Sequence, residues 1–478
     1  MTDARTLEQE RQLGRLVRLP GIAERLGERF AAAGHELYAV GGTVRDDLLD
    51  RGGEPDLDLA TSATPEETRR LVEPIADAIW LTGQRFGTVS ARVDGWTVEV
   101  TTFRADRYTG GSRHPEVRFG DSIEEDLARR DFTVNAMAVR TTDRRFVDPY
   151  GGLADLRAEV LRTPIDPDES FGDDPLRMVR LARFVAEIGL RPAPEAVDAA
   201  RRLAHRIDEP EPISRERIRD ELSRLLCGEH VRAAIDLLVT TGLADRFLPE
   251  VPAMRLERDP AHHHKDVYLH TLQVVERTPR DDLVLRLAAL LHDVGKPATR
   301  RFHPDGTVTF HHHEVVGARM ARPRLETLRF SKDVIDDVVQ LVELHLRFHG
   351  YADQPWTDSG VRRYVRDAGS AAQLRRLNLL TRADVTTGNR AKARRLQQAM
   401  DDLEARIAEL AEREELERIR PPLDGNQIMT HLGLQPGPLV GEAREHLLEA
   451  RMEHGPLSEE EGYRLLEEWA RERGLLEG

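Results

Sequence analysis

The hydrophobic pattern of this 478-residue chain changes near Asp166, and this change constrains the fold more than any other feature. Before it, short apolar runs bounded by turn residues indicate strands that alternate with helices. After it, apolar residues recur at helical spacing almost to the end of the chain. The sequence therefore predicts an α+β head over residues 1–165, followed by an all-α body.

The head contains several segments that resemble strands and one long helical segment. The helix is expected over 65–79, introduced by Thr64-Pro65, because threonine caps helices and proline suits their first turn. Strands are expected over 37–42, 57–63, 88–93, 96–103 and 145–152.

The body reads as a series of amphipathic helices. The first covers 174–188 and ends at Gly189, and others follow over 195–207, 213–227, 230–242, 267–278, 283–294, 314–328, 332–349, 371–383 and 392–418. The last of these carries apolar residues at alternating spacings of four and three, which indicates a hairpin or coiled-coil seam. We divide the chain into a head (1–165), a neck (166–258), a third domain (259–391) and a helical tail (392–478).

Composition restricts the cellular setting. No apolar run approaches the roughly 20 residues that cross a bilayer, so we expect no membrane association. The polar N-terminus is unlike a signal peptide. The only cysteine, Cys227, leaves no internal disulfide, which suits a reducing cytoplasm. The net charge of −15 argues mildly against a nucleic-acid partner but leaves room for a local basic face.

The most informative constellation lies between residues 39 and 63. Gly41 and Gly42 follow a strand and precede a helix, so backbone amides there can approach a phosphate, with Arg45 on the first turn. Asp56 and Asp58 lie two apart on the next strand and therefore share one face. Two carboxylates beside a phosphate cradle are suited to hold Mg²⁺ for chemistry on a nucleoside triphosphate.

These residues, and four motifs that follow in order, resemble the nucleotidyltransferase superfamily of CCA-adding enzymes and bacterial poly(A) polymerases. The motifs are DLARRDFTVNAMA (126–138), VDPYGGLADL (147–156), GDDPLRMVRLARF (172–184) and ISRERIRDEL (213–222). Five motifs over this stretch are similar to the eubacterial-type, class II enzymes. The resemblance implies a polymerase-β-like head that adds C, C and A to the 3′ end of tRNA from CTP and ATP.

The resemblance also implies roles for individual residues. Asp56 and Asp58 would be catalytic and hold Mg²⁺, while Asp174 and Arg177 would read the base edge of the incoming nucleotide. A carboxylate accepts from the exocyclic amine that C and A share, which G and U replace with oxygen at that edge. The remaining nucleotide-binding residues would be Gly41, Gly42, Arg45, Arg130, Asp131, Asn135, Arg180 and Arg183.

Three positions depart from the family pattern or extend it. Asp173 stands where the family has glutamate. Phe86 stands where many CCA-adding members have histidine, and it favours the poly(A) polymerase side. Glu99 is a candidate third carboxylate on a neighbouring strand, although ordinary strand alternation explains it equally well. The segment 104–122 reads as a loop near the metals or as a plain surface excursion.

A second constellation lies in the body. His292-Asp293 ends an apolar helix, and the order of histidines and aspartates around it resembles the HD phosphohydrolase superfamily, which implies a divalent metal of unknown identity. The implied ligands are His270, His292, Asp293, His313, His345 and Asp384. Mixed imidazole and carboxylate ligands suit a divalent ion that activates water against a phosphoester. His262–His264, His303 and His349 are expected at the surface instead.

Three functions remain open from the sequence. CCA addition is favoured by the tail segment 423–443, which resembles a C-terminal element of CCA-adding members. A poly(A) polymerase, or an enzyme that adds only A or only C, is the alternative in the same class. A metal-dependent phosphohydrolase or regulator with a relic head is the alternative of another class. The oligomeric state stays open.

Overall fold

The computed structural model describes residues 4–52, 56–81, 87–104, 120, 122–255, 266–305, 307–348, 350–351, 354, 356–386, 389–414 and 420–476. The chain forms two compact units, Met1–Phe247 and Leu248–Gly478. The predicted head and the predicted neck up to Phe247 lie in the first unit, whereas the rest of the predicted neck, from Leu248, lies in the second. The four-part division of the sequence analysis stays a prediction.

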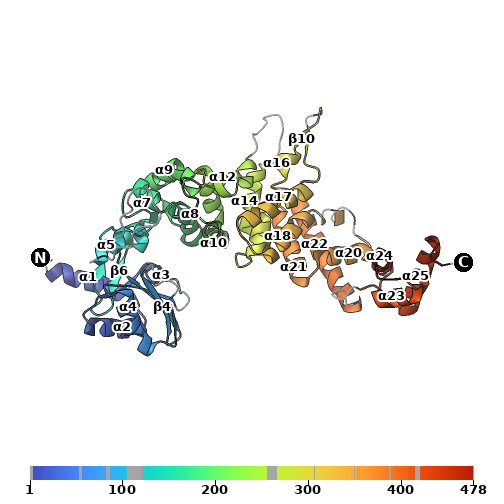
Figure 1. Ribbon diagram of the computed structural model, residues 1–478. Coiled ribbons are helices and arrows are strands. Elements are labelled where there is room, and N and C mark those ends of the chain that lie inside the picture. The colour runs from blue at the N-terminus through green and yellow to red at the C-terminus, as the bar shows by residue number, and fades with distance from the viewer. Residues whose placement is uncertain are drawn as a thin grey trace. The chain divides into compact units, whose positions relative to one another are not determined.

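The first unit is built on a mixed sheet, seen at the blue end of the chain (Figure 1). Within the described residues it has seven strands in the order β3-β4-β5-β2-β1-β6-β7. Only β2 and β5 run parallel, and their register sets Asp58 opposite Glu99. The strands are β1 (Leu37–Val40), β2 (Asp56–Thr61), β3 (Ala78–Trp80), β4 (Thr88–Val93), β5 (Trp96–Thr102), β6 (Ala138–Arg140) and β7 (Phe146–Val147).

Helices pack on this sheet and fix its central strands. Helix α2 (Gly21–Ala32) contacts β1, α3 (Gly42–Leu48) contacts β1 and β2, and α4 (Pro65–Val72) contacts β4 and β5. Helix α2 and the preceding α1 (Ala4–Leu16) were not among the predicted elements.

The predicted helix over 65–79 is wrong in its second half. It starts as expected at a Thr64 capping box but ends at Val72, and a 3₁₀ turn (Glu73–Ile75) and β3 follow. Pro74 explains the break, because it has no amide to continue the α-helical hydrogen bonds.

The neck helices complete the first unit. Helix α8 (Leu176–Ile188) packs against α10 (Arg215–Leu226) and α11 (Val231–Thr240), while α7 (Pro167–Asp173) packs against α9 (Pro194–Leu203). Helix α8 ends at Gly189 with φ +75°, as predicted. A short parallel pair, β8 (Val160–Leu161) with β9 (Arg191–Pro192), was not predicted because two-residue strands leave no periodic pattern.

The second unit is helical apart from a small hairpin. Its centre consists of α14 (Val267–Arg277), α15 (Leu283–Leu291), α17 (His313–Thr327), α18 (Lys332–Leu344) and α21 (Ala371–Asp384). Helix α18 packs against both α15 and α17, and α14 packs against α15 and α21. The hairpin of β10 (Arg301–Phe302) and β11 (Val308–Thr309) was not predicted.

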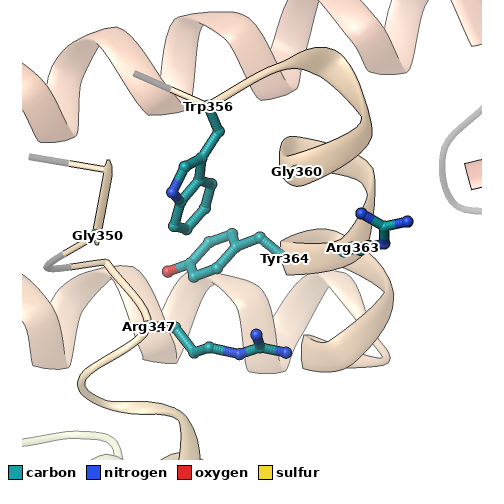
Figure 2. Close-up of a pocket in the computed structure, with 6 residues that line it drawn as sticks. All are labelled: Arg347, Gly350, Trp356, Gly360, Arg363 and Tyr364. Carbon is teal, nitrogen blue, oxygen red and sulfur yellow. The ribbon is translucent and has the colours of Figure 1, made fainter. Parts of the chain in front are cut away.

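A hollow of about 300 Å³ lies beside α20 (Asp358–Ala368), a helix that the sequence analysis missed (Figure 2). The rings of Trp356 and Tyr364 line it in a tilted contact with each other, with centroids 5.5 Å apart. A Cβ on Gly360 would lie 2.8 Å from the Cβ of Trp356, so glycine makes room for the indole. The rim arginines are paired with acids, Arg347 with Asp367 and Arg363 with Glu449 and Glu453.

The long helix α22 (Arg390–Glu414) buries the predicted seam. Leu396, Met400, Leu403 and Leu410 are buried, and the helix packs against α20 and α21. The tail helices α23 (Gly425–Leu432), α24 (Pro438–His454) and α25 (Glu459–Glu472) share a small core around Trp469. None of the described helices is long and apolar enough to span a lipid bilayer.

Candidate functional site

The glycine turn and the acidic strand meet at one edge of the sheet. Gly41 has φ +63°, a conformation that favours glycine, and opens α3. A Cβ on Gly42 would lie 3.6 Å from the carboxylate of Asp58, so the turn and β2 are in close contact. The amide of Asp58 donates to the hydroxyl of Thr43 at 2.9 Å, which ties the strand to the helix. Asp56 and Asp58 are both exposed, while the alternate residues of β2 are buried.

Acidic crowding marks this edge as a place for a cation. Loss of hydration raises the pKa of Asp58, and the nearby carboxylates of Glu99 and Asp56 raise it further, against Arg130 and Arg45. Asp58 therefore lies among like charges that a divalent cation would relieve. The oxygen ligands of Asp56 and Asp58, with Glu99 opposite, are of the kind that Mg²⁺ binds.

Arg45 is fixed by neighbours rather than extended toward solvent. Its guanidinium donates to both oxygens of Asp46 at 2.8 and 2.7 Å, and to the side-chain oxygen of Asn135 at 2.5 Å. It also lies over the ring of Phe184, 5.1 Å from the centroid. Since Asn135 is 90 residues away in sequence, this contact joins α3 to the arginine-rich motif.

A pocket of about 300 Å³ lies between the head and α8 within the first unit. It brings together five of the predicted nucleotide-binding residues: Arg130, Asp131, Asp174, Arg177 and Arg180. The other residues that line it are Thr101, Arg129, Leu176 and Arg217. Five arginines against two aspartates in this lining leave it with an excess of positive charge, which is suited to a polyanion such as a triphosphate.

A chain of buried ion pairs supports one side of this pocket. Arg180 donates to Asp131 at 2.9 and 2.6 Å and to Glu221 at 3.2 Å. Arg180 and other donors lower the pKa of Asp131, although burial alone would raise it, so this carboxylate stays ionised. Asp131 also accepts from the amide group of Asn135 at 2.8 Å.

Arg183 and Asn135 lie outside the lining of the pocket. Arg183 is 2% exposed and donates to Glu221 at 2.5 Å and to Glu187 at 2.5 Å. Its expected contact with phosphate or ribose is therefore not available in this structure, because α8 turns this arginine toward its neighbours. Both residues support the pocket indirectly: Asn135 donates to Asp131, and Arg183 donates to Glu221, which also accepts from Arg180.

The predicted base-reading residues are held in different ways. Arg177 is nearly buried and donates to the carbonyl and hydroxyl of Ser170 and to the carbonyl of Arg129. Asp174 caps the start of α8 through the amide of Leu176 at 3.1 Å, and its other oxygen accepts from Arg217 at 3.1 Å. Both side chains line the same pocket.

The second constellation forms a compact cluster in the second unit. His270 comes from α14, His292 and Asp293 follow α15, His313 begins α17, His345 follows α18 and Asp384 ends α21. Asp293 lies within 4.0 Å of each of the four histidines, at 3.5 Å from His270, 3.2 Å from His292, 3.3 Å from His313 and 4.0 Å from His345. Asp384 lies 2.8 Å from His270.

In three histidines of this cluster, the proton position and ring orientation suit metal binding. The Nδ1 atoms of His292, His313 and His345 lie 2.6–2.8 Å from backbone carbonyls, so each Nδ1 carries the proton. Their Nε2 atoms, and Oδ1 of Asp293, are buried with no hydrogen-bond partner. Buried acceptors that converge without donors need a cation, and two ligand triples share Asp293 here: His270 with His292, and His313 with His345.

Burial and charge keep His345 neutral. Loss of hydration and the charge of His292 lower the pKa of His345 to about 3, which leaves its Nε2 lone pair available at neutral pH. When no metal is bound, the positive charges of His292 and Lys296 hold the pKa of Asp293 well below its usual range despite its burial. Lys296 also contacts Asp293, at 2.6 Å.

The structure also bears on the remaining residues named from the sequence and on one residue, Asp126, that was not selected. His311 and His312 are exposed, as is His303, whereas His313 enters the cluster. Phe86, His262–His264, His349 and most of the segment 104–122 lie outside the described residues. Asp126, which contacts both Arg129 and Arg130, was not selected, although it stands inside the quoted motif.

Comparison with known families assigns most of the chain. Residues 37–162 match the family model described as "Poly A polymerase head domain". Residues 189–254 match "Probable RNA and SrmB- binding site of polymerase A", and residues 261–416 match "HD domain".

Relatives that match this chain over most of its length point to the same family. The chain is 36% identical to the A-adding tRNA nucleotidyltransferase of Deinococcus radiodurans over 77% of this chain and 84% of that protein. It is 31% identical to the CC-adding tRNA nucleotidyltransferase of Thermus thermophilus over 91% of this chain and 94% of that protein.

A solved structure extends the likeness to the fold. The crystal structure of the Bacillus stearothermophilus CCA-adding enzyme in complex with CTP matches with a TM-score of 0.68 and 27% identity. The match covers 96% of this chain and 99% of that one. Together with the sequence relatives, this match shows that the chain belongs to the eubacterial CCA-adding enzyme family of tRNA nucleotidyltransferases and carries an HD domain.

Proposed function

We propose that this enzyme adds C, C and A in turn to the 3′ end of tRNA, using CTP and ATP and no nucleic-acid template. The observation that carries the proposal is the pocket that places Asp174 and Arg177 in one cavity with Arg130, next to the carboxylates of β2. tRNA processing takes place beside the translation machinery, so we also propose a cytoplasmic location.

The residues of the pocket divide the work of nucleotide recognition. Arg129 and Arg130 would bind the triphosphate, because guanidinium groups pair with phosphate oxygens in bidentate fashion. Asp174 would accept from the exocyclic amine of cytosine or adenine, and Arg177 would donate to an acceptor on the ring. Uracil and guanine present an oxygen to Asp174 and would be rejected by charge repulsion.

Asp56 and Asp58 are the residues that would hold Mg²⁺. When bound there, the ion would supply charge neutralisation and lower the pKa of the primer 3′-hydroxyl. The protein's own part is to hold the nucleotide and the RNA end in line, which is the main source of rate in nucleotidyl transfer.

Restricted addition is the alternative, and the relatives favour it directly. Two relatives more than 30% identical to this chain are an A-adding and a CC-adding tRNA nucleotidyltransferase. The experiment is incorporation by purified protein with Mg²⁺ on transcripts that end before CCA, after C and after CC. CTP and ATP are supplied separately and together.

The outcomes separate the candidates. Growth by three nucleotides that stops at CCA and needs both triphosphates supports the proposal. Addition limited to CC, or limited to A on the transcript ending in CC, contradicts it in favour of restricted addition. Unlimited growth with ATP alone indicates a poly(A) polymerase.

A second activity is supported by the HD cluster. We propose that His270, His292, Asp293, His313, His345 and Asp384 hold a divalent metal that serves phosphoester hydrolysis. Four converging buried acceptor atoms without donors carry this proposal. The test is hydrolysis of p-nitrophenyl phosphate and bis-p-nitrophenyl phosphate by the metal-loaded protein, with Asp293→Asn as the comparison.

A further inference from the structure

A single buried carboxylate holds both arginines of the motif that begins at Asp126. Asp126 lies in α5 (Ile123–Ala128) and is 1% exposed. Its Oδ1 accepts from Nε and Nη2 of Arg129 at 3.3 and 3.2 Å. Its Oδ2 accepts from Nε and Nη2 of Arg130 at 3.3 and 3.1 Å. The backbone amide of Arg104 also points to Oδ1, at 3.4 Å.

Both arginines line the pocket, and each contacts a different part of the site. Nη1 of Arg130 lies so near the glycine turn that a Cβ on Gly41 would approach it to 2.8 Å. Arg130 is also the cation that most opposes the rise of the Asp58 pKa. In contrast, the backbone carbonyl of Arg129 accepts a hydrogen bond from Nη2 of Arg177 at 2.5 Å. Asp126 therefore holds the Arg130 side chain at the acidic edge and the Arg129 side chain next to the residue's own backbone carbonyl, which accepts from Arg177.

Charge and entropy explain why such a connection is useful. Two neighbouring guanidinium groups repel each other, and each long side chain loses rotamer freedom when it is fixed. One carboxylate fixes both before any nucleotide arrives and leaves one net positive charge facing the pocket. Arg130 and Arg129 lower the pKa of Asp126 against the effect of burial, so the carboxylate stays charged.

We propose that Asp126 is a positioning residue for nucleotide binding, which holds Arg129 and Arg130 so that their outward edges receive the triphosphate. It touches neither substrate nor metal and acts through the two arginines. This inference rests on the proposed nucleotidyl transfer, since it presupposes that the pocket takes a nucleoside triphosphate.

The test uses the full-length protein and the variant Asp126→Asn, with Asp155→Asn as the matched control. Asp155 is a partly buried acid of the same unit that accepts from Thr133 at 2.7 Å and pairs with Arg162, and it does not line the pocket. Binding of CTP and of inorganic tripolyphosphate is measured by calorimetry, and kcat and KM are measured for both nucleotides.

In Asp126→Asn, both the Kd for tripolyphosphate and the KM for CTP should rise by about 10-fold, since one set of charge-assisted contacts is lost. The value of kcat should change much less, and Asp155→Asn should leave all three constants unchanged. An Asp126→Asn protein that binds tripolyphosphate as tightly as the unchanged protein overturns the inference.

A double variant separates positioning from a general structural role. If Asp126 acts through Arg130, then Asp126→Asn should add little to the loss of tripolyphosphate binding already caused by Arg130→Gln. Full additivity would mean an independent structural effect and would overturn the inference. Should Asp126→Asn fail to fold, Asp126→Glu replaces it: the longer side chain keeps the charge but displaces both guanidinium groups, so the Kd for tripolyphosphate should still rise, and an unchanged Kd contradicts the inference.

Failure of the proposed function is recognised separately. In that case the unchanged protein itself binds no CTP and extends no transcript. Failure of the present inference instead leaves an active unchanged protein and an equally active Asp126→Asn protein.

Discussion

Asp174 and Arg217 form an ion pair in the lining of the pocket between the head and α8, with Nη2 of the arginine 3.1 Å from Oδ2 of the aspartate. Asp174 precedes α8, whereas Arg217 projects from α10, 43 residues further along the chain. The arginine holds the carboxylate in the orientation in which its other oxygen caps α8.

Replacement of Arg217 by alanine should therefore impair base selection. We expect kcat/KM for CTP and for ATP to fall about 10-fold, because a charge-assisted hydrogen bond contributes roughly 1.5–3 kcal/mol. Discrimination against UTP should narrow, since Asp174 loses its fixed orientation. The measurement is single-nucleotide incorporation with each triphosphate. Arg219→Ala on the same helix, whose side chain pairs with Asp220, is the control and should keep both values.

Gly41 and Gly34 allow the backbone cost of a side chain to be separated from its steric cost. Both have positive φ, +63° and +85°, but a Cβ on Gly34 meets nothing within 4 Å, whereas one on Gly41 approaches Arg130 to 2.8 Å. Alanine at either site should lower the free energy of unfolding by roughly 1 kcal/mol. Only Gly41→Ala should also raise KM for CTP. An equal KM in the two variants would contradict the proposed contact.

Removal of metal should destabilise the second unit, because the converging histidines and Asp293 are left without a partner. A ligand present at about 100 times its Kd stabilises the folded state by roughly 2.7 kcal/mol. We therefore expect chelation to lower Tm and Asp293→Asn to abolish metal retention, measured by calorimetry and elemental analysis. Asp305→Asn, in the exposed hairpin region, should retain the metal. Full retention by Asp293→Asn would remove Asp293 from the ligand set.

Acid should destabilise the metal-free protein through His345. Its pKa is about 3 when folded and near 6.5 when unfolded. Between these values the unfolded chain binds the extra proton, so stability falls as pH decreases below about 6.5. At pH 5 the free energy of unfolding should be about 2 kcal/mol lower than at pH 7 because of this histidine. Thermal unfolding between pH 7 and 5 measures it.

This prediction is checked against His345→Gln, whose free energy of unfolding should fall less between pH 7 and 5. The raised pKa of His292 acts in the opposite direction in both proteins, so it does not account for the difference. His303→Gln, at an exposed histidine, should behave like the unchanged protein. Parallel pH profiles for all three would show that His345 does not titrate as described.

The local features of both centres could be predicted from the amino-acid sequence. The period of two on β2 brought Asp56 and Asp58 to the exposed face, and helical spacing located α8 up to its terminal Gly189. The glycine pair predicted the turn at Gly41. These features depend on residues within a few positions of each other, which is the range over which periodicity and capping act.

Some individual elements were predicted with the wrong length or were not predicted at all. The helix over 65–79 was extended beyond Pro74, and α20 and the two-residue strands were missed. Short or interrupted elements depend on what packs against them more than on their own propensity.

Which distant side chains come into contact follows from the packing of the folded chain and could not be predicted from the sequence. The parallel register of β2 and β5 sets Glu99 opposite Asp58, and the packing of α8 turns Arg183 inward while Arg180 stays at the pocket. The choice of His313 over its two neighbours depends on how α17 packs beside α18. Such contacts join segments tens of residues apart, and their geometry follows from the packing of the whole core rather than from any local pattern.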